Sequence, residues 1–292
     1  MDATPVASEY SEHITDADLR FLAGVASAPA GQAEAEAARL RRDPDAVAAL
    51  LASPRAFEAV FGSASAGEPV LASPFLAFAV AVHRAAADLA SVGYVPERSL
   101  ARQRVPVFDA PELRDFLGSA ARRLFLTELL ASFTRVASGR YRVTSGGRSR
   151  TRRFSELDPV RLAGLLDAVP EQSRPGVYRR LGDVALFLSG VFPDYVAGRA
   201  FGPVDAARLL RAAQVPAAER ERLAGSPDLE LLELLGARWY RSALALAPVR
   251  TSRLDVVGEV AERFRQARRV LNHVADRYLL GPDSPWFAVP GR

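Results

Sequence analysis

The amino-acid sequence predicts an all-α fold, a multi-helix bundle with one inserted, arginine-rich β-hairpin. Three observations carry this prediction. Capping residues followed by proline recur at short intervals, apolar residues recur at spacings of three and four, and one segment in the middle of the chain departs from both patterns. Hydrophobic residues make up 49% of the 292 residues and charged residues 25%, which is a globular composition rather than a disordered one.

Most of the expected helices begin with a small polar residue followed directly by proline. The polar side chain accepts hydrogen bonds from free backbone N–H groups, and proline fits the first turn because its missing N–H would have no partner there. These pairs are Asp43-Pro44, Ser53-Pro54, Ser73-Pro74, Asp158-Pro159, Ser226-Pro227 and Ser284-Pro285. Residues 15–18 and 109–112 add starts that resemble capping boxes. Such closely spaced signals are typical of helices joined by short loops.

The apolar residues between these signals follow a helical period. Long helices are predicted at residues 75–89, 112–136, 228–247 and 254–278. Residues 182–192 are apolar on nearly every side and predict a central buried helix, in which Gly182 and Gly190 let neighbouring helices approach closely. Residues 27–32 and 62–69 are rich in small residues and are typical of linkers. We therefore expect an N-terminal Ala-rich helical region, residues 1–68, and a main helical domain, residues 69–292.

The exception to helix lies between Arg135 and Phe154. Short β-favouring runs flank Gly146-Gly147, which predicts a hairpin at about residues 138–154. This span contains no acidic residue and seven arginines, at positions 135, 140, 142, 148, 150, 152 and 153. The whole chain has a formal net charge of +4, so the remainder has a net charge of −3 once these seven are set aside. The basic character is therefore local.

The sequence allows two strand-pairing registers for this hairpin. A two-residue turn at Gly146-Gly147 places Tyr141 opposite Arg152 and distributes arginines over both faces. A three-residue loop starting at Ser145 instead places Arg140 opposite Arg152 and Arg142 opposite Arg150. The second register stacks like charges, which is destabilising unless an anion compensates.

The arginine-rich hairpin is compatible with three functions. It could contact phosphates of nucleic acid without reading sequence, contact an acidic protein partner, or be a solvated element whose charges prevent pairing with other chains. The candidate contact residues are Arg140, Arg142, Arg148, Arg150, Arg152 and Arg153. All 38 basic residues of the chain are arginine, which also fits the codon bias of a GC-rich genome, so the choice of arginine carries little information. No zinc finger, basic zipper or recognition helix is recognised, and sequence-specific DNA reading is not predicted.

The residue types needed for several kinds of catalysis are missing. The chain has no cysteine and no lysine, which excludes thiolate metal sites, Schiff-base lysines and a standard phosphate-binding loop. None of the three histidines follows the Glu-x-x-His spacing of di-iron bundles. We therefore expect no catalytic residue, no metal site and no cofactor, and a non-catalytic binding or regulatory protein is favoured over an enzyme.

Three polar residues in apolar helices are candidates for a buried polar network: Asp183, Arg268 and His83. A buried carboxylate must be paired or protonated. Asp183 could be a general acid or base, which is the basis of an alternative in which the protein is an enzyme with a site in the bundle. It could also form a salt bridge to Arg179 or Arg180. A further alternative is a structural subunit of a larger assembly.

The first 19 residues carry five acidic side chains and no basic one, which is unlike a secretory signal or a mitochondrial transit peptide. The longest uncharged apolar stretch, residues 69–82, is too short to cross a bilayer as a helix. A cytoplasmic protein without a membrane partner is expected.

Three stretches carry a family resemblance: residues 73–76 (Ser-Pro-Phe-Leu), 105–109 (Val-Pro-Val-Phe-Asp) and 181–194 (Leu-Gly-Asp-Val-Ala-Leu-Phe-Leu-Ser-Gly-Val-Phe-Pro-Asp). With these stretches the chain resembles an uncharacterised all-helical family of prokaryotic proteins, from about Asp43 to the C-terminus. The shared motifs concern packing and capping. The resemblance implies a helical fold and no known activity.

Overall fold

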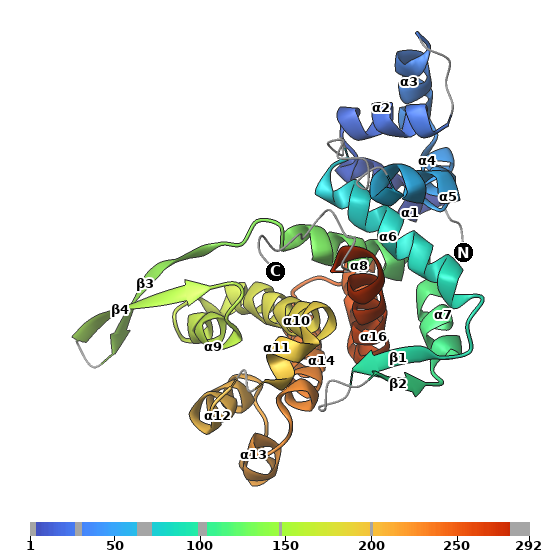
Figure 1. Ribbon diagram of the computed structural model, residues 1–292. Coiled ribbons are helices and arrows are strands. Elements are labelled where there is room, and N and C mark those ends of the chain that lie inside the picture. The colour runs from blue at the N-terminus through green and yellow to red at the C-terminus, as the bar shows by residue number, and fades with distance from the viewer. Residues whose placement is uncertain are drawn as a thin grey trace, which may run out of the picture. The chain divides into compact units, whose positions relative to one another are not determined.

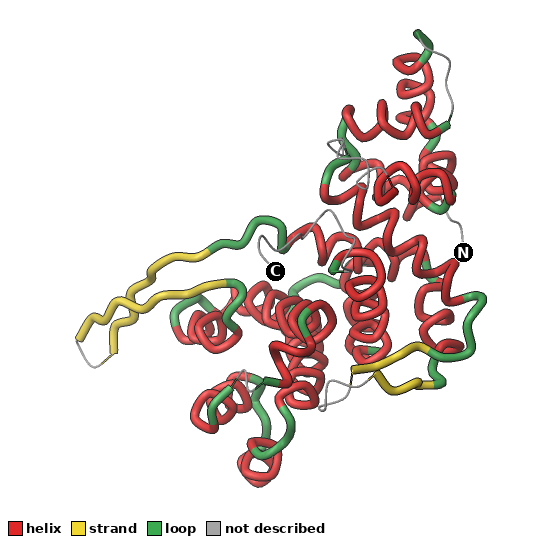
Figure 2. The backbone as a smooth tube through the Cα atoms, viewed as in Figure 1, coloured by secondary structure: helices red, strands yellow, loops and turns green. Residues whose placement is uncertain are grey.

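The computed structural model describes residues 4–26, 31–62, 72–98, 104–145, 148–198 and 201–280. Within these ranges the chain is mostly helical with one inserted antiparallel hairpin, which confirms the predicted fold class (Figures 1 and 2). Most of the two predicted linkers, residues 27–32 and 62–69, lies outside the described residues, as does the expected helix start at Ser284-Pro285.

The described chain forms two compact units, and each is described here by itself. Unit 1 consists of residues 1–95, 106–134 and 273–292, and unit 2 of residues 96–105 and 135–272. The expected N-terminal region, residues 1–68, is thus one part of unit 1, which also takes in helices from later in the chain.

Unit 1 is built from short helices around one long one. Its elements are α1 (Thr4–His13), α2 (Asp16–Val25), α3 (Ala33–Arg42), α4 (Pro44–Leu51), α5 (Pro54–Phe57), the π-helix η1 (Glu58–Gly62), α6 (Pro74–Leu89), α7 (Ala110–Gly118), α8 (Ala120–Ser132) and the π-helix η5 (Ala275–Leu279). Fully buried side chains such as Leu22, Leu40 and Leu76 form its core. Helix α6 is buried along most of its length, in agreement with its apolar run from Pro74 to Val82.

The predicted caps are present at several helix starts of unit 1. The side chains of Asp43, Ser53 and Ser73 each accept a hydrogen bond from the backbone N–H three residues later, at 3.0–3.2 Å. Thr15 and Asp18 form the expected capping box. The buried Asp18 carboxylate also accepts a hydrogen bond from the Ser73 N–H at 2.7 Å, so it joins the starts of α2 and α6.

Two helices predicted as continuous are divided. The segment 112–136 breaks at Ser119, whose hydroxyl accepts a hydrogen bond from the Arg122 N–H and caps α8. The segment 254–278 breaks at Arg263, which separates α15 (Ser252–Glu262) from α16 (Phe264–Val274). Phe264 packs its ring on Gly236, where any larger side chain would collide with it. The demands of this packing override the apolar period.

Unit 2 is organised around the pair α10 and α14 (Figure 1). Its elements are α9 (Pro159–Ala163), the 3₁₀ helices η3 (Gly164–Asp167) and η4 (Glu171–Ser173), α10 (Arg174–Val191), α11 (Pro193–Ala197), α12 (Pro203–Ala212), α13 (Ala217–Ala224), α14 (Asp228–Leu246), α15 and most of α16. The close approach predicted at Gly182 and Gly190 is confirmed. The ring of Tyr240 lies against Gly182 and the side chain of Leu271 against Gly190, in space that a Cβ atom would occupy.

The inserted hairpin consists of β3 (Ser138–Ser145) and β4 (Arg148–Ser155). A second pair of short strands, β1 (Val95–Arg98) and β2 (Arg104–Val107), was not predicted. Each of these strands contains a proline, Pro96 or Pro106, which argues against a strand except at a sheet edge. A two-stranded sheet consists of edges alone, so proline is tolerated there.

Candidate functional site

The hairpin has the register that follows from a two-residue turn. Tyr141 pairs with Arg152, and Val143 pairs with Arg150. Arginine residues therefore occupy both faces of the ribbon, because residues directly opposite each other share a face and successive residues alternate. Arg140, Arg142 and Arg153 belong to one face, and Arg150 and Arg152 to the other. The turn residues Gly146-Gly147 and the side chain of Arg148 lie outside the described residues.

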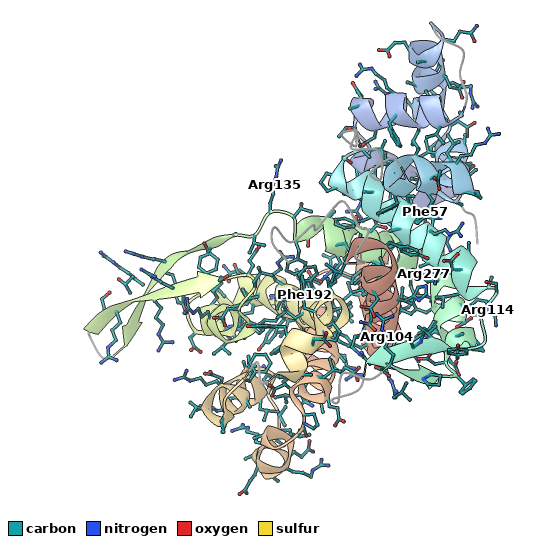
Figure 3. The ribbon with its side chains drawn as sticks, viewed as in Figure 1. Phe57, Arg104, Arg114, Arg135, Phe192 and Arg277 are labelled. Atoms are coloured by element: carbon teal, nitrogen blue, oxygen red, sulfur yellow. The ribbon has the colours of Figure 1, made fainter. Side chains whose placement is uncertain are left out.

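Exposed side chains project to both sides of the hairpin (Figure 3). Arg140, Arg142, Arg150, Arg152 and Arg153 are all exposed. Arg135 extends from the loop that precedes β3 (Figure 3). Within the described residues, none of the five hairpin arginines has a carboxylate partner.

Other arginines of unit 2 do have such partners. Arg161 is 2.9 Å from Asp158, Arg180 is 3.0 Å from Glu156, and Arg208 is 3.2 Å from Asp205. The five hairpin guanidinium groups therefore lack the intramolecular compensation that these three arginines have. Its positive charge is available to an external anion.

The base of the hairpin contacts the helices of unit 2. The hydroxyl of Tyr141 lies against Gly164, the first residue of η3, where any Cβ atom would collide with it. Within the hairpin, the ring of Phe154 covers Gly139 in the same way. Glu156 accepts hydrogen bonds from the Ala137 N–H and from the Arg180 guanidinium, both at 3.0 Å. Strand β4 also runs beside α9 (Figure 1). The ribbon therefore has a fixed root and an exposed outer part.

Four arginines that were not predicted from the sequence lie near this root. Arg161, Arg174, Arg208 and Arg211 line a pocket of about 1000 Å³ together with Arg152 and Arg153 of the hairpin. They come from α9, α10 and α12, and no spacing in the sequence relates Arg161 and Arg174 to each other or to the two arginines of α12. Only the tertiary structure brings them together. Of the pocket arginines, only Arg152 and Arg153 were candidates from the sequence.

The three residues expected to form a buried polar network have separate sets of partners. Asp183, 9% exposed, accepts hydrogen bonds from the Arg179 guanidinium at 2.9 Å and from the Tyr240 hydroxyl at 2.8 Å. Burial and the neighbouring Asp183 carboxylate raise the pKa of Tyr240 well above its usual value. The hydroxyl therefore stays protonated and donates a hydrogen bond to the carboxylate.

Arg268 is almost fully buried in unit 2. Its guanidinium contacts Glu97 at 2.5 Å and also contacts Glu233, so β1 and α14 each supply a carboxylate. His83 belongs to unit 1, on α6, where its ring lies 5.7 Å from that of Tyr10. Burial, assisted by the charge of Arg123, lowers the pKa of His83 to about 3. Its imidazole is neutral at physiological pH.

The described side chains and helices bear on metal binding and on membrane insertion. In these ranges no three His, Asp or Glu side chains come together in a way that could hold a metal ion. None of the described helices is both long enough and apolar enough to cross a bilayer. Exposed arginines gather at the hairpin, and further arginines line the pocket at its root.

Comparison with protein-family models, with curated proteins and with solved structures finds no match to this chain. This agrees with the resemblance to an uncharacterised helical family, and it indicates no known activity.

Proposed function

We propose that this is a non-catalytic, cytoplasmic helical binding protein whose hairpin, residues 138–155, contacts the phosphate backbone of nucleic acid. The observation that supports this proposal best is the set of five exposed hairpin arginines without a carboxylate partner in the described chain. Arginine side chains that neutralise phosphates supply affinity without reading sequence. An acidic protein segment is the other partner that this charge would attract.

The distribution of charge over both faces favours nucleic acid over an acidic protein. A flat acidic surface would meet only one face of the ribbon and leave the arginines of the other face in solvent. A groove between two phosphate backbones meets both faces at once. The major groove of B-DNA is about 12 Å wide and admits a two-stranded β-ribbon. The major groove of A-form RNA is deep and narrow. Duplex DNA is therefore the nucleic acid that suits the hairpin best.

An enzyme site at Asp183 has less support. Its carboxylate is nearly inaccessible and already accepts hydrogen bonds from two side chains of its own unit. The contact with Tyr240 joins α10 to α14, which is sufficient reason for a buried acid at this position.

The test is fluorescence anisotropy of labelled duplex DNA, duplex RNA and single-stranded DNA with the purified protein at two salt concentrations. We expect duplex DNA to bind most tightly and its affinity to fall steeply with salt. A hairpin variant carries Arg140→Gln, Arg142→Gln and Arg150→Gln, and it should lose most of this affinity. The logarithmic salt slope should decrease by about 0.9 for each phosphate that the variant no longer neutralises.

The matched control variant carries Arg222→Gln, Arg250→Gln and Arg265→Gln. It removes the same charge from exposed positions on unit 2 away from the hairpin. It should bind duplex DNA like the wild type. Equal losses in the two variants would show attraction by net charge alone and would contradict the proposal. Tighter binding of a labelled polyglutamate peptide than of DNA would replace nucleic acid with an acidic protein partner.

A further inference from the structure

The pocket at the root of the hairpin is strongly basic. Its volume is about 1000 Å³, at the upper end of the range for small-molecule sites. Six arginines line it, at positions 152, 153, 161, 174, 208 and 211, and Asp167 is the single acidic residue among the lining residues. The lining therefore carries an excess of five positive charges. Nearby Asp158 and Asp205 offset two of them, at Arg161 and Arg208.

One of these arginines, Arg174, is partly buried at the start of α10. The Nε atom of Arg174 is inaccessible to solvent and has no hydrogen-bond partner among the described residues. Other buried donors of the described chain, such as Arg123 Nε and Trp239 Nε1, share this condition, so the Nε atom of Arg174 does not by itself mark a ligand site. Arg174 begins α10 and lines the pocket, so its guanidinium adds one positive charge to the lining.

The pocket also contains a hydroxyl that retains a free proton. Tyr178 is 4% exposed, and its hydroxyl accepts a hydrogen bond from the Gln214 side-chain amide at 3.1 Å. A phenol that accepts one hydrogen bond still has its own O–H to donate. Tyr178 and Gln214 both line the pocket, so this proton is available to a bound oxygen.

Gln214 occupies a position at which glycine is the usual residue. Its φ of 55° is the only positive value at a non-glycine residue within the described ranges. It follows the end of α12 in a Schellman motif, in which the N–H groups of Gln214 and Val215 bond to the carbonyls of Arg211 and Leu210. The Arg238 guanidinium holds this turn by donating to the carbonyls of Ala213 and Gln214. The side chain at 214 thus reaches Tyr178 in spite of the conformational cost.

We infer that this pocket binds a small molecule with two or more phosphate groups. Arginines from β4, α9, α10 and α12 converge on it from several directions, which suits a compact ligand with several anionic oxygens. A nucleic-acid backbone would instead follow the outer part of the ribbon. Such a ligand would bridge Arg152 and Arg153 of the hairpin to the helices. The inference rests on the pocket alone and stands apart from the proposal that the hairpin binds DNA.

The experiment is isothermal titration calorimetry of the purified protein with sodium tripolyphosphate, ATP and orthophosphate. We expect tripolyphosphate and ATP to bind at a ratio of one per chain, and orthophosphate to bind at least tenfold more weakly. Tighter binding of ATP than of tripolyphosphate would assign the ligand to the nucleotides, and equal binding would assign it to the polyphosphates. Absence of binding by both compounds at millimolar concentration would overturn the inference.

Two variants with the same change in charge locate the site. The pocket variant carries Arg161→Gln, Arg174→Gln and Arg211→Gln, and the hairpin variant is the one with substitutions at 140, 142 and 150. Tripolyphosphate affinity should fall at least tenfold in the pocket variant and remain near the wild-type value in the hairpin variant, whereas DNA affinity should show the reverse pattern. Equal loss of tripolyphosphate affinity in both would place the anion outside the pocket and overturn the inference.

A single substitution keeps the test valid if the pocket variant does not fold. Tyr178→Phe removes only the hydroxyl and leaves every arginine in place. Tripolyphosphate affinity should fall at least threefold, with an unchanged circular dichroism spectrum. Full affinity in a folded Tyr178→Phe protein would contradict the part assigned to this hydroxyl and, with it, the inferred mode of binding.

Discussion

Arg140 and Arg153 lie directly opposite each other in the β3–β4 ladder. Like charges at opposed positions of an antiparallel pair destabilise it. From the sequence, such stacking was expected in the other register, in which Arg140 would oppose Arg152. The observed register therefore keeps one opposed arginine pair, next to the root of the hairpin. A polyanion bound between the two guanidinium groups would attract both and so offset this repulsion.

The opposed pair predicts that Arg140→Thr strengthens the free hairpin. Threonine favours strands and removes one of the two charges. Hydrogen exchange of the β3 and β4 amides, followed by mass spectrometry at low salt, should be slower in the variant than in the wild type. The difference should shrink at 1 M salt, where screening acts over about 3 Å. Faster exchange in the variant would show that Arg140 stabilises the ladder.

The hydrogen bond between Tyr240 and Asp183 predicts a clear loss of stability in Tyr240→Phe. The substitution keeps the ring that packs on Gly182 and removes the donor to a buried carboxylate. Leaving this acceptor partly unsatisfied should lower the free energy of unfolding by about 1–3 kcal/mol. Urea denaturation measures the change, with Tyr195→Phe as the control because Tyr195 is 66% exposed. A similar midpoint in both variants would contradict a structural role for the bond.

From the lowered pKa of His83 we predict that the free energy of unfolding decreases in acid. Burial lowers its pKa from 6.5 to about 3, so the unfolded chain takes up this proton at a higher pH than the folded one. The stabilisation is complete above pH 6.5 and is lost as the pH falls toward 3, by up to about 1.4 kcal/mol per pH unit. The His83→Leu variant lacks this contribution. Urea denaturation at several pH values should therefore show a shallower decline in the variant, and parallel curves would contradict the assignment.

From the raised pKa of Tyr10 we predict that the free energy of unfolding decreases in alkali. Burial raises its pKa to about 12, so its contribution is complete below pH 10 and is lost as the pH rises from 10 toward 12. The chain has no lysine and no cysteine to titrate in this range, and the pKa values of Tyr240 and Tyr278, which are also raised, affect the wild type and the Tyr10 variant alike. Urea denaturation of the wild type and of Tyr10→Phe at pH 9, 10 and 11 should give curves that separate as the pH rises. A constant difference would show that another group controls the alkaline limit.

The positive φ of Gln214 predicts an unequal effect of glycine and alanine. Both substitutions remove the hydrogen bond to Tyr178, but only glycine relieves the left-handed backbone. Gln214→Gly should therefore be more stable than Gln214→Ala by about 1 kcal/mol. Thermal unfolding of the two variants gives the comparison. Equal melting temperatures would mean that the turn relaxes in the alanine variant.

The elements predicted correctly from sequence are those whose signals are local. The caps at Asp43, Ser53 and Ser73 act over three residues, and the hairpin turn is marked by Gly146-Gly147. The break at Ser119 also has a local signal, a serine that caps the next helix, but the continuous apolar period around it concealed that signal. The break at Arg263 has none, because it depends on the fit of Phe264 against a glycine 28 positions earlier in the chain.

The same distinction applies to the polar residues. Arg179 lies one helical turn from Asp183 and was predicted as a partner from spacing alone, whereas Tyr240 is 57 positions away and was not. Glu97 is 171 positions from Arg268. The pocket arginines come from four separate elements, so no window of the sequence contains the site. Charge density revealed the hairpin because all of its arginines are neighbours in the chain.

The hydrogen bonds of Glu156 have a consequence for how this chain can change over evolution. Glu156 and Ala137 are bonded through both the backbone and the Glu156 side chain, so the two ends of the hairpin meet where it leaves the helices. The outer part of the ribbon, beyond the pair Tyr141 and Arg152, can lengthen or shorten without altering the helices or the hairpin residues that line the pocket. Changes of two residues in each strand preserve which arginines share a face, and changes of one residue exchange the faces. Reach and charge pattern can thus diverge among descendants while the root and its pocket stay intact.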